Sequence, residues 1–108
     1  MAIRQITGGA FQDASGKALA GGSITFRLST DAVASDSQVS APVLTKATLD
    51  SNGNISGTVN IWPNPQLTPA TVYKISVYNA QGLLAWYSEN SIPSGVGSFD
   101  IGTLTPLF

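Results

Sequence analysis

The sequence predicts an all-β protein that forms a single antiparallel β-sandwich of about seven strands, transthyretin-like or Ig-like. Three observations support this prediction. Apolar and polar residues alternate in several short segments, as expected for strands with one face in the core and the other in water. Three four-residue segments have the composition of tight hairpin turns. No long window has the 3.6-residue periodicity of an amphipathic helix.

Seven segments have the composition of β-strands, and the inward-facing residues of the three strongest are expected to form the core. One of these three, 83–88, has apolar residues at both alternating positions, so we expect it to be covered on both faces. In chain order the segments are 3–12, 22–29, 43–49, 55–61, 71–78, 83–88 and 99–104. The predicted core residues are Ile24, Phe26, Leu28, Tyr73, Ile75, Val77 and Trp86.

Three turns are predicted between these strands, at 13–16, 50–53 and 79–82. Each begins with Asp or Asn, whose side chain accepts a hydrogen bond from a backbone N–H. Each has a glycine three positions later, where a positive φ is required. This pattern is typical of a type I turn followed by a left-handed glycine in a short hairpin. The glycines expected to have a positive φ are Gly16, Gly53 and Gly82.

Two segments interrupt the strand pattern. Residues 31–41 are small and polar, which is typical of a mobile surface loop. Residues 62–69 contain three prolines, each of which fixes φ and removes a hydrogen-bond donor. We therefore expect 62–69 to be a stiff, extended crossover between strands.

The length and composition limit the function as well as the fold. The chain has 108 residues, which fits one domain over 1–108, and 43% of them are apolar, which is enough for a hydrophobic core. Only 10% are charged and the formal net charge is −1, so polarity comes mainly from 13 serines and 10 threonines. We expect a soluble globular domain that is not an enzyme.

The absence of His and Cys excludes imidazole bases, thiol nucleophiles, disulfides and zinc sites that use either residue. Five scattered basic residues in a slightly acidic chain do not indicate a nucleic-acid-binding surface. No secretory signal or membrane-spanning segment is evident, so we expect a protein made in the cytoplasm without membrane contact. We expect no cofactor.

Acidic residues suggest two kinds of site, and neither is favoured. Residues 50–54 carry oxygen-bearing side chains at alternate positions, as a calcium loop does. An EF-hand loop requires Gly at its sixth position and Glu at its twelfth, whereas Gly53 is the fourth residue here and Ile61 the twelfth. A hairpin is the preferred interpretation. Glu89 and the five aspartates do not form a recognisable catalytic pair.

Aromatic residues leave a carbohydrate-binding or adhesive module as the alternative function, because aromatic platforms on β-sandwiches stack against sugars. Trp86 lies in an apolar strand and is expected in the core. Trp62 precedes Pro63 in the crossover and either contacts a partner or fastens this segment to the edge of the sandwich. Under this alternative, Trp62 or Tyr87 would bind the glycan.

Residues 9–26 resemble the start of a transthyretin-like (carboxypeptidase-regulatory-like) sandwich. This family begins with a strand, a turn with Asx and Gly-Lys, a step of small residues and a second strand. Residues 49–56 resemble the next hairpin of the same family. The resemblance implies the fold and says little about function.

A second resemblance covers nearly the whole chain. The segments 49–54, 61–64, 67–69, 73–82 and 99–106 occur in this order in proteins that resemble accessory structural proteins of tailed bacteriophages. It implies a non-enzymatic virion protein, assembled in the host cytoplasm, without catalytic residues. Such a capsid decoration or fibre-associated protein would bind repeated copies of a head or tail subunit and copies of itself.

The residues 104–108 are mostly apolar. Leu107 and Phe108 either fold back over the edge of the domain or dock on a neighbouring subunit. The assembly implied by the phage resemblance favours docking. Trp62, Leu107 and Phe108 are therefore the candidate interaction residues.

Overall fold

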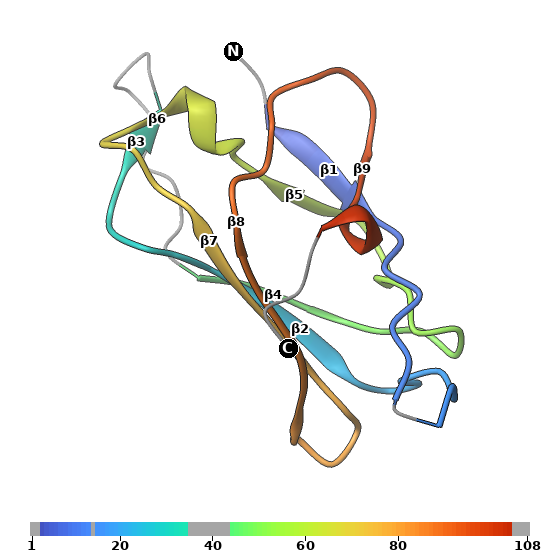
Figure 1. Cartoon of the computed structure of the whole chain (residues 1–108). Coiled ribbons are helices and arrows are strands. Elements are labelled where there is room, and N and C mark those ends of the chain that lie inside the picture. The colour runs from blue at the N-terminus through green and yellow to red at the C-terminus, as the bar shows by residue number, and fades with distance from the viewer. Residues whose placement is uncertain (1–2, 14, 35–43, 105–108) are drawn as a thin grey trace.

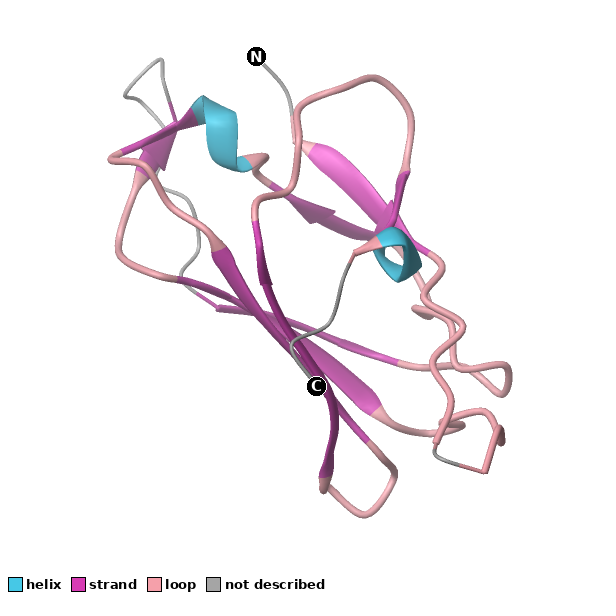
Figure 2. Ribbon diagram, in the orientation of Figure 1, coloured by secondary structure: helices cyan, strands magenta, loops and turns pink. Residues whose placement is uncertain are grey.

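The computed structural model describes residues 3–13, 15–34 and 44–104. This part of the chain contains nine strands, two 3₁₀ turns and no α-helix, which confirms the all-β prediction (Figures 1 and 2). The strands are β1 (Arg4–Thr7), β2 (Ser23–Leu28), β3 (Val33–Ala34), β4 (Leu44–Thr48), β5 (Val59–Ile61), β6 (Leu67–Thr68), β7 (Tyr73–Tyr78), β8 (Leu84–Asn90) and β9 (Phe99–Asp100). The 3₁₀ turns are η1 (Asn64–Gln66) and η2 (Ile101–Thr103).

The largest sheet has four antiparallel strands in the order β4-β2-β7-β8. One face of it is the predicted core face: six of the seven predicted core residues are at most 3% exposed. The seventh, Trp86, is partly buried and packs against the core, with its ring centroid 5.0 Å from that of Phe11. The period-two pattern therefore identified the buried face correctly.

A second sheet has three strands in the order β5-β1-β9, and β3 pairs with β6 in a separate two-stranded ribbon. Ile6, Val59 and Ile61 of the second sheet join the buried residues of the four-stranded sheet in one core cluster. Strand β9 runs parallel to β1, so this pair departs from the predicted antiparallel arrangement. Figure 1 shows β1 and β9 side by side at one end of the molecule.

The strand β8 is not covered on both faces as predicted. Leu83, just before it, is 66% exposed and Leu84 is 45% exposed. The physical reason is that the four-stranded sheet packs on the core with one face only, so the outer face of β8 has no layer to cover it. The register between β7 and β8 also shifts at Val77 and Tyr78.

The weaker strands are shorter than predicted. Strand β1 ends at Thr7 because the next three residues have positive φ: Gly8 (73°), Gly9 (106°) and Ala10 (46°). After β9 the chain turns at once into η2, where the Asp100 carboxylate accepts a hydrogen bond from the N–H of Gly102 at 2.8 Å. In both places a local turn ends the strand earlier than composition indicates.

The two predicted irregular segments contain more structure than expected. Within 31–41, β3 pairs with β6, and the remaining residues from 35 lie outside the described residues. The crossover 62–69 is not extended throughout, because the N–H of Gln66 donates to the carbonyl oxygen of Pro63 and closes η1. Prolines suit the start of such a turn, since the first N–H groups have no partner within it.

The three predicted hairpin turns are confirmed, and all three use the same hydrogen bonds. The first residue accepts, through its Oδ1 atom, the N–H groups two and four positions later at 2.8–3.0 Å. The glycine three positions later donates its N–H to the carbonyl oxygen of the first residue. The glycines have φ values of 83° (Gly16), 79° (Gly53) and 84° (Gly82).

One buried polar side chain connects distant loops. Asn64 is 5% exposed, and its Nδ2 donates to Thr71 Oγ1 at 2.9 Å. Its Oδ1 accepts the N–H of Ile92 at 2.7 Å, and its own N–H donates to the Ile92 carbonyl oxygen at 3.0 Å. The segments before β7 and after β8 are thereby fixed to η1.

The turn glycines should differ in their sensitivity to substitution. Each Gly→Ala change should cost about 1 kcal/mol because of the positive φ. Gly53→Ala should cost at least about 1 kcal/mol more, because its Cβ would lie 2.3 Å from the Phe11 carbonyl oxygen. Gly16 and Gly82 are the matched controls, because no atom of the described residues lies within 4 Å of a Cβ at either position. Urea denaturation measures the difference, and equal costs at all three positions would contradict it.

Loss of the Asn64 side chain should lower the free energy of unfolding substantially. Asn64→Ala leaves the Ile92 N–H and the Thr71 hydroxyl buried without their partner, so we expect a loss of about 2–4 kcal/mol in the free energy of unfolding. The control is Asn60→Ala on the exposed face of β5, which should change it by less than about 0.5 kcal/mol. Similar costs for both variants would show that the Asn64 contacts are unimportant.

Candidate binding surface

The three residues singled out from the sequence are placed differently. Trp62 follows β5, is partly buried and packs against the core cluster. Its carbonyl oxygen accepts a hydrogen bond from the Tyr73 hydroxyl at 2.8 Å, which fastens the crossover to β7. Leu107 and Phe108 lie outside the described residues. Within the described residues, the predicted candidates therefore do not form a cluster.

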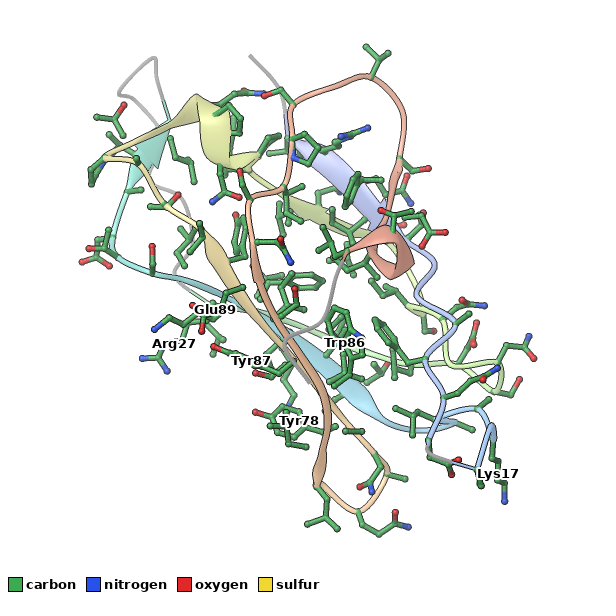
Figure 3. All side chains as sticks on the ribbon, viewed as in Figure 1. Lys17, Arg27, Tyr78, Trp86, Tyr87 and Glu89 are labelled. Atoms are coloured by element: carbon green, nitrogen blue, oxygen red, sulfur yellow. The ribbon has the colours of Figure 1, made fainter. Side chains whose placement is uncertain are left out.

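A polar surface covers the side of the four-stranded sheet that faces away from the core. We call this side the outer face. In Figure 3, Arg27, Tyr78, Tyr87 and Glu89 lie on this side, whereas Trp86 points to the opposite side. Strand register adds Lys74, opposite Arg27, and Lys46, opposite Thr25, so the outer face carries three of the five cations in a chain of net charge −1.

The charged side chains on the outer face do not form ion pairs among the described residues. Arg27 and Lys74 lie directly opposite each other in the register of β2 and β7. Like charges in this position destabilise a sheet. Glu89 lies opposite Lys74 on the other side, yet within the described residues no ion pair joins Glu89 to Lys74 or Arg27. The sheet therefore holds two cations together at a cost to its own stability.

A shallow groove of about 390 Å³ lies on the outer face. Its lining includes the cations Arg27 and Lys74 and the phenol rings of Tyr78 and Tyr87. Its other lining residues are Thr25, Ser76 and Leu44. Cationic, aromatic and hydroxyl groups are thus brought together from β2, β7 and β8, and β4 adds the aliphatic Leu44.

The Tyr87 hydroxyl is part of a polar pair at the edge of this groove. It donates a hydrogen bond to Glu89 Oε2 at 2.8 Å. This hydrogen bond stabilises the protonated phenol and raises the pKa of Tyr87, with smaller contributions from burial and from the negative charge of Glu89. The pair fixes the position of the Tyr87 ring on the outer face.

Two other hollows on the surface offer fewer charged and aromatic groups that could bind a ligand. The first, of about 290 Å³, lies beside η1 and β6, and none of the described residues that line it is ionisable. The second, of about 300 Å³, lies between the turns 13–16 and 79–82 and contains Asp13 and Lys17. The Asp13 carboxylate already accepts three hydrogen bonds in its own turn, which lower its pKa. Neither hollow combines free charge with aromatic surface.

A braced loop forms a second exposed feature, between β8 and β9 (Figure 1). Arg4 holds its base: Nη1 donates to the Pro93 carbonyl oxygen at 2.8 Å and Nε to that of Gly97 at 3.3 Å. The guanidinium also lies 5.1 Å from the centroid of the Phe99 ring, a cation–π contact. Between these anchors, Val96 is 98% exposed. The loop thus presents an apolar side chain on a supported backbone.

The described residues do not form a metal site. In the described part of the chain, no three His, Cys, Asp or Glu side chains gather to hold a metal ion. Asp50 Oδ1 accepts the N–H groups of Asn52 and Asn54, so the segment considered as a calcium loop is a hairpin turn. Within the same residues, no helix is long and apolar enough to cross a membrane.

Comparison with known protein families, curated proteins and solved structures finds no match to this chain. The functional interpretation therefore depends on the residues themselves. Sequence analysis identified Tyr87 as a candidate but missed Arg27, Lys74 and Tyr78. Each of these occupies a solvent-facing position of a strongly alternating strand, and that position was the available evidence.

Replacement of Glu89 should change the titration of Tyr87. Glu89→Gln removes both the charged acceptor and the negative charge, so the pKa of Tyr87 should fall toward 10. Residue-specific NMR titration of labelled tyrosines measures this, with Tyr87→Phe assigning the resonance. Tyr73 is the internal control, because burial raises its pKa to about 12 and Glu89→Gln should leave it there. An unchanged Tyr87 pKa would contradict the pair.

Proposed function

We propose that this chain is a non-enzymatic structural protein of a tailed-phage virion, a capsid decoration or accessory protein. It is assembled into the virion in the host cytoplasm, where it binds repeated copies of a head or tail subunit and associates with copies of itself. Trp62, Leu107 and Phe108 remain candidate contact residues in this proposal. The phage resemblance of the sequence supports it, as does a surface where few charges need desolvation.

The observation that carries the proposal is the braced loop. The Val96 side chain is 98% exposed, so it does not stabilise the isolated domain by burial. Because it is apolar, it would be more favourably placed against a partner. The Arg4 contacts hold the backbone on both sides of Val96. A supported loop loses little conformational entropy on docking, so its apolar contact is retained as affinity.

We further propose that the two larger sheets form one sandwich of seven strands, of the transthyretin-like or Ig-like type. The shared core cluster and the order of elements along the chain support this assignment. The parallel pairing of β9 with β1 and the β3–β6 ribbon would be additions to that plan. The compact domain would then stand as a small unit on the surface of the particle.

The function is tested by purification of assembled particles. If the chain is a virion component, it should copurify with particles in fixed stoichiometry. Val96→Ser should reduce particle occupancy about fivefold or more, because the apolar contact is lost, and should leave the melting temperature unchanged.

The matched control is Leu83→Ser, which changes another exposed apolar residue at a distant turn and should preserve occupancy. Full occupancy of Val96→Ser would exclude the loop as the contact. Absence of the chain from purified particles would exclude the virion function itself.

A further inference from the structure

The groove on the outer face has the properties of a ligand site. We propose that it binds an acidic saccharide, with Arg27 and Lys74 holding the sugar carboxylate and Tyr78 and Tyr87 contacting the ring. This inference goes beyond the virion function and does not depend on it. A particle protein with such a site would also attach to acidic glycans.

The charge of the groove favours an anion. Arg27 and Lys74 face each other across β2 and β7, and no carboxylate in the described residues pairs with either. A bound carboxylate would relieve their mutual repulsion. The guanidinium of Arg27 can bind both carboxylate oxygens, while Lys74 adds a point charge from the neighbouring strand.

The shape of the groove favours a ligand that lies flat on the sheet. Thr25 and Ser76 lie opposite each other in register and have short side chains, so they form the floor. Lys74 and Tyr78 are four residues apart on β7, roughly 13 Å along an extended strand. The volume of about 390 Å³ is within the range of small-ligand sites.

The aromatic and hydroxyl groups favour a sugar over a purely acidic ligand. The C–H groups of a pyranose pack against phenol rings, and both Tyr78 and Tyr87 line the groove. The hydroxyls of Thr25 and Ser76 can donate to and accept from sugar hydroxyls. Glu89 opposes an anion, but its carboxylate accepts the Tyr87 hydroxyl, and the described residues of this face still include three cations to one carboxylate.

An acidic protein segment is the competing occupant. Such a segment would require an apolar pocket for its other side chains to gain affinity and specificity. Among the described residues that line the groove, Leu44 at its margin on β4 is the only aliphatic one. A lining of cations, phenols and hydroxyls fits a polyhydroxylated acid better.

The test is NMR titration of the full chain with two acidic sugars, a galacturonate trimer and sialyllactose, against neutral lactose and a glutamate peptide. At least one acidic sugar should shift amide resonances of β2, β7 and β8, and the effect should weaken with salt. Lactose and the glutamate peptide should bind at least about tenfold more weakly. Arg27→Gln, Lys74→Gln and Tyr78→Ala should each reduce affinity about tenfold.

The matched control is Lys17→Gln, which makes the same charge change at a remote turn and should leave affinity unchanged. Arg27→Gln should retain or raise the melting temperature, because it removes half of a like-charge pair. Lys74→Gln removes both this repulsion and the attraction to Glu89, so it should leave the melting temperature nearly unchanged. Binding of neither acidic sugar would overturn the proposal. Equal binding of the glutamate peptide would overturn it in favour of a protein partner, and equal loss in Lys17→Gln would show non-specific charge attraction.

Discussion

The amide side chain of Asn64 connects segments that belong to different sheets, and the relative position of these sheets depends on it. Asn64 follows β5 of the three-stranded sheet, whereas Thr71 precedes β7 and Ile92 follows β8 of the four-stranded sheet. Because a buried polar group without a partner is costly, the three segments become buried together. The Tyr73 hydroxyl adds a second link through the Trp62 carbonyl oxygen in the same region.

A second set of polar contacts fixes the segment where the chain leaves β1 for β2. The N–H groups of Gly9 and Ala10 donate to the side chains of Asp100 and Asn54 at 3.1 and 2.8 Å. Positive φ values orient these N–H groups, and a Cβ at Gly8 would lie 2.3 Å from Asp100 Oδ1. Glycine at this position therefore reflects close approach as well as backbone conformation. The apolar core lies between elements that these contacts and those of Asn64 hold in place.

Features that depend on contacts between residues close in the sequence were predicted, whereas features that depend on contacts between distant residues were not. The three hairpin turns depend on bonds within five residues, and the core face of β7 follows from alternation, so both were predictable. The left-handed Ala10 and the parallel β9 depend on partners more than forty residues away along the chain. The groove could not be predicted for the same reason, because Arg27 and Lys74 are brought together only by the register of two strands that are not consecutive.

The cations have two different roles: Arg4 stabilises the domain, whereas Arg27 and Lys74 are the groups proposed to bind a ligand. Arg4 stabilises the loop around Val96, and its guanidinium contacts are made within the domain. Arg27 and Lys74 have no such contacts among the described residues, and their repulsion weakens the sheet that carries them. A rigid four-stranded sheet tolerates this cost because its stability comes from the opposite, apolar face. The same rigidity fixes the spacing of the two backbone positions, so a bound anion would have to order only the two side chains.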